Sequence, residues 1–457
     1  MKSYKPSLIA CFATLTFLYS LPAQSNQSDI PPSIDSRLIA NPVFEQRTNR
    51  VLPAGLSSDP LTSRQWHLDA PPTEIAGTGL RDALETPQQL DSVIVAIVDT
   101  GILSTHSDMG TVLPGYDFVS DVTAANDGDG RDADATDPGD WISQSDIDEG
   151  VFPSDCGVAN STWHGTAVAG MLAAKNDNEL GLAAAAPLAL ILPVRVMGRC
   201  GGTVSDLIDG IRWAAGLQVS GVETNPNPAS VINLSLGYVG SCDSAMQKAI
   251  TDVTRAGAVV VTAIGNGGYA LSEQPYSPAI CDGVITVAAA DREGNFATYN
   301  NSGDAVDILA PGGEPGSGLT TLDDGGSQSA RNDDLYQARY GSSIATPLVS
   351  ATAALMLAAN PLLEPHHIED LLIENTRAVS DAGQCPNNSC GSGLIDARLA
   401  VHAAATADVL ELRSADELYG GGGGGSMNPL LILLVILTRL DKARLLLTQN
   451  KSRNRTR

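Results

Sequence analysis

Residues 93–101 read VIVAIVDTG, an unbroken apolar run that ends at Asp99 and is followed by a Thr-Gly turn. A run of Val and Ile without polar alternation is typical of a strand buried on both faces, as in parallel sheets. Residues 257–267 repeat this pattern, with a second apolar run that breaks at Gly-Asn-Gly. The sequence therefore predicts an α/β fold, with a mostly parallel central sheet and helices on both faces.

Asp99 stands at the carboxyl end of the first predicted strand, where open α/β sheets place functional groups. An ordinary strand end at an Asp-Thr-Gly turn is the alternative explanation. His164 begins a run of small residues, 165–174, which predicts a helix able to pack deep inside the fold. A histidine that bonds to nearby backbone would look the same.

Ser343 precedes Ile-Ala-Thr-Pro and the apolar stretch 348–356, so we expect a helix that begins near this serine, with Pro347 in its first turn. The N–H of Ser343 and the helix dipole would then face a developing oxyanion. A helix-capping serine is the alternative. Ser342 is a second candidate nucleophile, and the local pattern does not choose between the two.

Asn266 lies in the Gly-Asn-Gly break, where a side-chain amide could donate a hydrogen bond to an oxyanion. An ordinary Asn-Gly turn would have the same sequence. An Asp, a His, an Asn and a Ser in this order provide the parts of a nucleophilic hydrolase.

The segments Asp-Thr-Gly (99–101), His-Gly-Thr (164–166) and Gly-Ser-Ser-Ile-Ala-Thr-Pro (341–347) resemble the signatures of the subtilisin-like serine proteases. The resemblance runs from about Asp59 to about Ala405. It implies a subtilisin-like three-layer fold and peptide hydrolysis through an acyl-enzyme. In that register Asp99 orients the imidazole, His164 is base and acid, Ser343 is the nucleophile and Asn266 lines the oxyanion hole. Extended substrate would pair with Ser235, Leu236 and Gly237 on one side and with Gly201 and Gly202 on the other.

Length and charge limit the other functions. The chain has 457 residues and a net charge of −25, which excludes nucleic acid as an expected partner. We expect protein or peptide substrates and a monomer. Residues 1–25 have a positive start, an apolar core and a small-residue exit, which predicts a secretory signal peptide. Residues 26–58 then form a short pro-segment or extension, and residues 59–405 the catalytic domain.

Six cysteines remain once the signal peptide, with Cys11, is removed. An even number in an exported protein favours disulfides, and six cysteines allow fifteen pairings. Cys385 and Cys390 are close enough in sequence to pair locally. The resemblance to secreted Gram-negative members of the family implies the pairs Cys156–Cys200 and Cys242–Cys281. Free buried thiols are the alternative.

Two stretches carry oxygen donors suited to structural calcium. In the family that the chain resembles, an aspartate after the first signature is a calcium ligand, and here it is Asp108. Its partner loop would be residues 176–181, so Asp108 and Asp177 are the expected ligands. The second stretch, residues 127–134, alternates aspartate with glycine. A solvated acidic insertion explains this second stretch equally well.

The carboxyl end carries a further expectation. Residues 406–426 form a linker that ends in six glycines, and residues 427–457 hold an apolar run and a basic end. This arrangement resembles the glycine-glycine sorting signal of Gram-negative bacteria. It implies contact with export machinery, cleavage by a rhomboid-type intramembrane protease, and a final place outside the cell or on its surface.

The apolar run in this tail, residues 430–437, is far shorter than the roughly 20 residues that span a bilayer. A plain interfacial tail is the alternative. We therefore expect a secreted serine endopeptidase. A membrane-tethered processing protease is the second possibility, and a peptide-binding pseudoenzyme the third.

Overall fold

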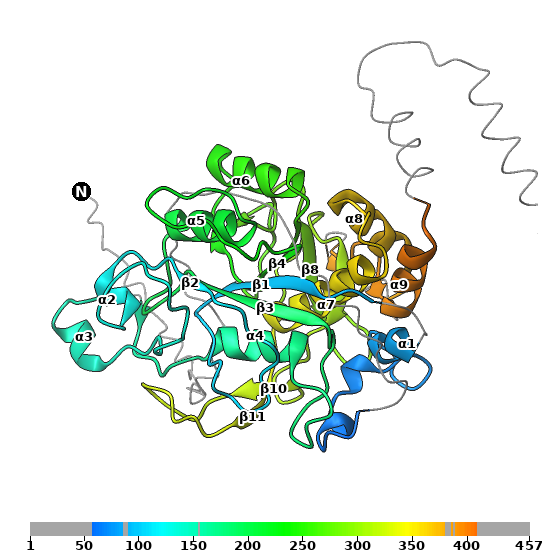
Figure 1. The fold of residues 1–457 in the computed structure, drawn as a ribbon, viewed down its shortest axis with the longest axis horizontal. Helices are drawn as coiled ribbons and strands as arrows, with labels where there is room; N and C mark the ends of the chain where they lie inside the picture. Colours follow the sequence, from blue (N-terminus) through cyan, green and yellow to red (C-terminus); the bar gives the residue numbers. More distant parts are fainter. Residues whose placement is uncertain (1–56, 86–89, 154–155, 380–384, 387–388, 409–457) are drawn as a thin grey trace, which may run out of the picture. The chain divides into compact units, whose positions relative to one another are not determined.

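A nine-stranded sheet forms the centre of the computed structural model, which describes residues 57–85, 90–153, 156–379, 385–386 and 389–408 (Figure 1). From one edge to the other, the strands are β12 (Thr376–Arg377), β13 (Leu394–Ile395), β9 (Ile308–Pro311), β8 (Ile285–Ala290), β6 (Val259–Ala263), β4 (Val231–Leu234), β1 (Val93–Asp99), β3 (Ala189–Arg195) and β2 (Tyr116–Asp117). Only the β12–β13 pair within this sheet is antiparallel.

β1 lies inside the sheet, with β3 on one side and β4 on the other. Val95, for example, is in register with Ile191 of β3 and Val231 of β4, and all three side chains are fully buried. This double burial is the reason why residues 93–98 carry no alternating polar positions.

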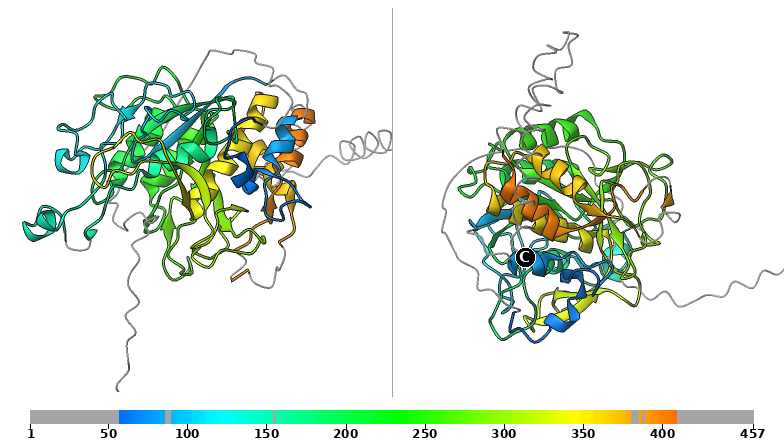
Figure 2. Two further views of the ribbon diagram at one scale, coloured as in Figure 1. Left: turned by 90° about the horizontal axis from the view of Figure 1, so that it is seen from below. Right: turned by 90° about the vertical axis from the view of Figure 1, so that its right-hand side faces the viewer.

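Helices cover both faces of the sheet, as Figures 1 and 2 show. α5 (Val204–Ala214) and α6 (Ser244–Arg255) pack on one face, and α4 (His164–Ala173) and α7 (Ser342–Ala359) on the other. α9 (Ala397–Thr406) packs against α7, α8 (Pro365–Glu374) and α1 (Leu80–Glu85). The predicted α/β architecture is therefore confirmed.

Smaller elements surround this centre. β10 (Leu319–Asp323) and β11 (Leu335–Arg339) form an antiparallel pair next to α4, and β5 (Tyr238–Val239) pairs with β7 (Tyr276–Ser277). Two short helices, α2 (Val122–Ala125) and α3 (Gln144–Asp148), lie in the long connection between β2 and α4.

α7 is long and apolar enough to cross a membrane, but 94% of it is buried inside the protein. It packs against five neighbouring strands of the sheet, β1, β4, β6, β8 and β9. This is the environment of a core helix, and the apolar composition of residues 342–359 is explained by it.

The chain divides into two units, Met1–Thr406 and Ala407–Arg457, and the fold described above belongs to the first. The predicted signal peptide, nearly all of the 26–58 extension, the polyglycine and the apolar tail lie outside the described residues. Those expectations stay predictions.

Candidate active site

Three of the predicted site residues lie together at the carboxyl ends of their strands, because these strands are parallel neighbours. Asp99 ends β1, Ser235 follows β4, and Asn266 lies three residues after β6. The carboxyl ends of parallel strands lie together, which is where open α/β sheets place their sites.

His164 reaches these strand ends as the first residue of α4. Its Nδ1 lies 2.8 Å from Oδ1 of Asp99, whose side chain is fully buried. The same Asp99 oxygen accepts the N–H of Thr100, at 2.8 Å. The Thr100 hydroxyl in turn accepts the N–H of Gly165, at 3.0 Å. Asp99, the last residue of β1, and Thr100, which follows it, thus fix two adjacent residues of α4.

Gly165 allows this contact. A Cβ at that position would lie 2.1 Å from the carbonyl oxygen of Gly101, so no residue with a side chain fits. The small-residue helix predicted over 164–174 is present as α4, and all its residues are buried.

Ser343 lies in the first turn of α7, which begins at Ser342, next to the serine where we predicted its start. Pro347, however, lies in the second turn and not in the first. Because proline has no N–H, the carbonyl of Ser343, four residues earlier, has no helical donor. That carbonyl accepts the hydroxyl of Ser235 instead, at 2.8 Å.

The structure separates the two candidate serines. Ser342 donates its N–H and its hydroxyl to Oδ1 of Asn266, at 2.8 and 2.9 Å. Its Oγ also accepts the N–H of Gly265, at 3.2 Å. Ser342 therefore orients the Asn266 amide, which leaves the NH2 group of that amide on the side toward Ser343.

Gly341 marks where this amide and the Ser343 hydroxyl converge. A Cβ on Gly341 would lie 3.1 Å from Nδ2 of Asn266 and 3.2 Å from Oγ of Ser343. The residue has a φ of 140°, a conformation that favours glycine. The backbone approaches the site closely here, and a side chain would enter the space between the two groups.

Three buried polar atoms in the described part of the chain are without a hydrogen-bond partner at this site: Ser343 Oγ, His164 Nε2 and Asp99 Oδ2. Buried polar groups are usually paired, and exceptions call for an explanation. A catalytic role would explain these unpaired atoms, because catalytic hydrogen bonds often tighten only when substrate is bound.

The pKa of the His164 imidazole is raised above its ordinary value. Burial by itself would lower its pKa, but the charge of Asp99 and the hydrogen bond to Asp99 outweigh burial and raise the pKa above 6.5. Arg339 acts against this rise and Asp140 supports it. The imidazole is therefore suited to accept a proton from a serine hydroxyl.

Sequence reasoning missed a second pair of carboxylates behind the site. Asp137 accepts the Thr100 hydroxyl at 2.7 Å, and Asp140 accepts the N–H and the hydroxyl of Thr162 at 2.6 and 2.7 Å. Burial and the charge of Asp140 raise the pKa of Asp137 to about 7. The only signal in the sequence was the short Asp-Pro-Gly-Asp segment, which reads as a turn.

The predicted substrate edges follow the strands on either side of β1. Ser235, Leu236 and Gly237 come directly after β4, and Gly201 and Gly202 come after β3, just before α5. Gly202 packs so that a Cβ would lie 2.1 Å from the Val196 carbonyl oxygen. Both segments therefore leave the sheet at the carboxyl ends of the strands, where Asp99 also lies.

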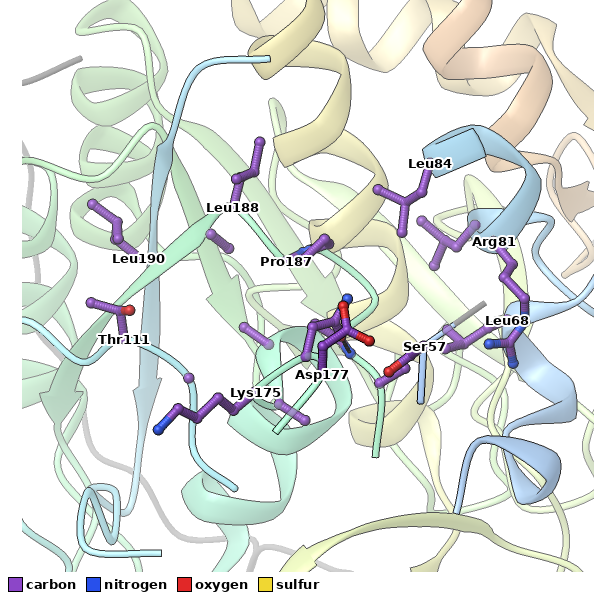
Figure 3. Close-up of a pocket in the computed structure, with 18 of the residues that line it drawn as sticks. Ser57, Leu68, Arg81, Leu84, Thr111, Lys175, Asp177, Pro187, Leu188 and Leu190 are labelled. Carbon is purple, nitrogen blue, oxygen red and sulfur yellow. Dashed lines mark hydrogen bonds between the residues drawn. The ribbon is translucent and has the colours of Figure 1, made fainter. Parts of the chain in front are cut away.

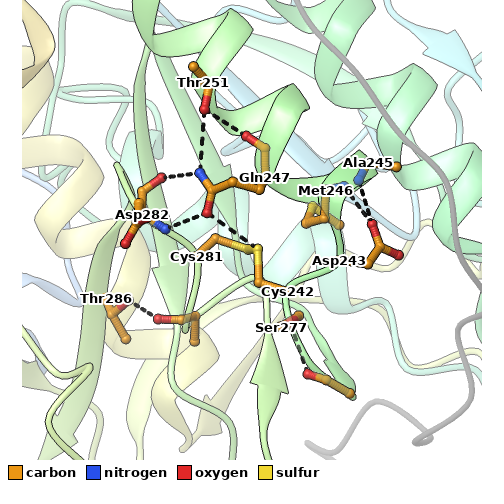
Figure 4. Close-up of a disulfide and its surroundings, with 12 residues drawn as sticks. Cys242, Asp243, Ala245, Met246, Gln247, Thr251, Ser277, Cys281, Asp282 and Thr286 are labelled. Carbon is orange, nitrogen blue, oxygen red and sulfur yellow. Dashed lines mark hydrogen bonds between the residues drawn. A yellow bond between two sulfur atoms is a disulfide. The ribbon is translucent and has the colours of Figure 1, made fainter.

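Three disulfides join the six described cysteines in the predicted pairs, with Cα–Cα distances of 5.3, 5.4 and 5.5 Å for Cys156–Cys200, Cys242–Cys281 and Cys385–Cys390. Figure 4 shows the second pair beside Gln247, which donates to the carbonyl of Asp282 and accepts its N–H. This bridge ties the chain after the 235–237 edge to the chain that follows β7.

The expected calcium ligands both accept hydrogen bonds from the protein. Asp108 accepts the N–H of Leu182 and the Asn178 amide, at 2.8 and 2.9 Å, and Asp177 accepts the N–H of Ser58 at 3.0 Å. Across the described residues, no three or more His, Cys, Asp or Glu side chains are placed to share a metal ion. The donor set at Asp108 and Asp177 therefore does not fit calcium.

Comparison with known proteins places these features in a family. The sequence pattern of the subtilase family matches residues 91–393. An extracellular protease of Xanthomonas campestris is 41% identical over 372 residues, 80% of this chain and 61% of that protein. An extracellular basic protease of Dichelobacter nodosus is 39% identical over 357 residues, 77% of this chain and 56% of that protein.

A solved protease structure from Pseudoalteromonas arctica is 40% identical, covers 77% of this chain and 100% of its own, and superimposes with a TM-score of 0.69. This chain spans about three fifths of the length of the Xanthomonas and Dichelobacter proteases.

Replacing Gly341 by alanine should reduce kcat/KM about a hundredfold, because small displacements at a reacting centre cost about that much. The added Cβ would press on Asn266 Nδ2 and Ser343 Oγ. The matched control is Gly257→Ala, which has a similar positive φ of 97° but nothing within 4 Å of the new Cβ. Equal activities of the two folded variants on a peptide substrate would contradict the assignment of this space to the site.

The raised pKa of His164 predicts a shifted acid limb. The base must be neutral to accept a proton, so kcat/KM should fall as pH decreases through a midpoint above 6.5. Asp137 titrates in the same region, so the profile is measured on the parent and on Asp137→Asn. A midpoint that stays above 6.5 in both belongs to His164, and a midpoint below 6.5 in the parent contradicts the prediction.

Proposed function

Because this chain belongs to the subtilase family, we propose that it is a secreted serine endopeptidase that cleaves peptide bonds through an acyl-enzyme. Two observations support this most: the buried hydrogen bond between Asp99 and His164, and a buried Ser343 hydroxyl that has no hydrogen-bond partner in the described structure. Extracellular proteases among the relatives support secretion.

In this proposal Ser343 Oγ attacks the scissile carbonyl while His164 Nε2 takes its proton. The C–O bond forms, and the carbonyl electron pair moves onto oxygen, where Asn266 Nδ2 and the Ser343 N–H stabilise it. The oxyanion then collapses and the C–N bond breaks as His164 gives the proton to the leaving amine. Water hydrolyses the acyl-enzyme by the same steps, and the proton returns to Ser343 Oγ as the product acid leaves. Asp99 holds the imidazole tautomer in which Nδ1 carries the hydrogen.

The protein substrate would lie extended between residues 235–237 and 201–202, with backbone hydrogen bonds supplying most of the affinity. We propose broad specificity, since no acidic side chain of these two edges stands ready to select a basic residue. A membrane-tethered processing protease is the second candidate, and the carboxyl tail is the feature that favours it.

The outer segments extend the proposal. A signal peptide over residues 1–25 would direct export, and residues 26–58 would be removed or kept as an extension of the 59–405 domain. A linker over 406–426 would expose residues 427–457 to a rhomboid-type protease, and release would leave a monomer outside the cell. We place calcium at the acidic stretch 127–134, whose aspartates offer hard oxygen donors. These aspartates would have to draw together on binding, because no three of them are placed to share an ion in the described structure.

Ser343→Ala should reduce casein hydrolysis by at least about a thousandfold, because it removes the attacking oxygen. Ser342→Ala is the matched control: it loses the hydroxyl hydrogen bonds to Asn266 and from Gly265 but keeps its N–H bond to Asn266, so a loss of about tenfold to a hundredfold is expected. Both are measured as rates of peptide release at equal concentrations of folded protein. Casein hydrolysis that survives in Ser343→Ala would refute the mechanism.

The tail is tested by mass spectrometry of the protein secreted by its own host. Processing predicts a carboxyl terminus at or close to the polyglycine, residues 420–425, and loss of the basic end. A secreted protein whose mass includes Arg457 would rule out this cleavage.

A further inference from the structure

The loop between α4 and β3 is built around a carboxylate. Asp59, which is 2% exposed, accepts three consecutive backbone N–H groups, those of Asp177, Asn178 and Glu179, at 2.8, 3.0 and 3.1 Å. Its neighbour Ser57 donates its hydroxyl to the same carboxylate. We call residues 175–182 the 175–182 loop and residues 57–59 the N-terminal latch.

The backbone of this loop is bent to make the N–H groups converge. Asp177 and Glu179 both have positive φ, 54° and 63°, on either side of Asn178. Successive N–H groups that point into one concavity form an anion-binding nest. Left-handed conformations are unfavourable for residues other than glycine, and they persist only where the surroundings hold them.

A cation would need the opposite arrangement, with oxygen lone pairs directed into the loop. Several of the oxygens here already accept hydrogen bonds from the protein. Asn178 Oδ1 accepts the N–H of Leu180 at 2.9 Å, and the carbonyl of Gly181 accepts the N–H of Leu61 at 2.8 Å. Both oxygens of Asp108 accept donors from the same loop. The inner side of the loop therefore presents hydrogens.

The latch also holds the loop from outside. Ser58 donates its N–H to Asp177, so the latch and the loop exchange hydrogen bonds in both directions. Ser57 and Asp177 lie together at the rim of a cavity of about 630 Å³ (Figure 3). The cavity reaches Ser92 and Leu190, at the amino-terminal ends of β1 and β3. Asp99 lies at the other, carboxyl end of β1.

We infer that the carboxylate of Asp59 closes the 175–182 loop in place of a metal ion, so that this loop is independent of calcium. Asp59 is then a structural part of the mature protein. Any maturation cut must therefore come before Asp59, and a cut after it would open the loop.

The test measures the opening of this loop alone. Trypsin is added to the full chain carrying Ser343→Ala, which removes self-digestion, and the rate of the cut after the exposed Lys175 is followed by mass spectrometry. Asp59→Asn keeps the size of the side chain but removes its charge. Charge-assisted hydrogen bonds are about twice as strong as neutral ones, so the cut should become about tenfold faster or more.

The matched control is Asp69→Asn, a nearby carboxylate that pairs with Arg81 and does not contact the loop. Its rate should stay within about twofold of the parent, because this ion pair is partly exposed and does not hold the loop. The inference is overturned if Asp59→Asn and Asp69→Asn are cut at the same rate.

Calcium supplies the second readout, and it needs no variant in the loop. The parent should be cut after Lys175 at the same rate in excess calcium and in excess chelator. Calcium bound elsewhere, for example at residues 127–134, would raise the melting temperature without slowing this cut. A cut that calcium slows tenfold or more would overturn the inference, whether or not Asp59→Asn folds.

Discussion

The close approach of α4 to the end of β1 is the constraint on which the rest of the site depends. Gly165 lies against the carbonyl of Gly101, and this contact brings His164 Nδ1 to 2.8 Å from Asp99. A larger residue at 165 would push the helix outward and break the buried hydrogen bond. An unpaired buried carboxylate is costly, so the same contact serves both the stability of the domain and the basicity of the imidazole.

The nucleophile is positioned by an exception to helical hydrogen bonding. Pro347 denies the Ser343 carbonyl its helical donor, and Ser235, at the end of β4, donates in its place. Ser235 in turn accepts from Asn233, which accepts from Ser350 of the same helix. A chain of side-chain hydrogen bonds thus joins the sheet to the start of α7. Ser235, one of the residues expected to bind substrate, thus also helps to hold Ser343 in position.

The sheet and the main site residues could be predicted because their signals are local. A buried parallel strand must be apolar throughout, and a helix that approaches a strand closely must be built from small residues. The network behind the site could not be predicted in this way. Asp137 and Asp140 lie in an irregular connection, and their link to Thr100 and Thr162 depends on tertiary contacts between distant segments. Pro347 was predicted in the wrong turn of α7, because a proline is tolerated one turn deeper where Ser235 replaces the missing donor.

The expected calcium ligands show that amino-acid composition alone does not decide whether a loop binds a cation. Residues 176–181 are rich in oxygen atoms, but every peptide unit carries a donor as well as an acceptor. Which of the two faces inward is decided by φ and ψ, and therefore by the partner that the loop closes on. The positive φ values of Asp177 and Glu179 turn the donors inward, toward a carboxylate 118 to 120 residues away in sequence. Asp59 belongs to a stretch that resembles a domain boundary and carries no motif. The sign of the charge that such a loop binds is a property of the backbone, and side-chain identity alone does not determine it.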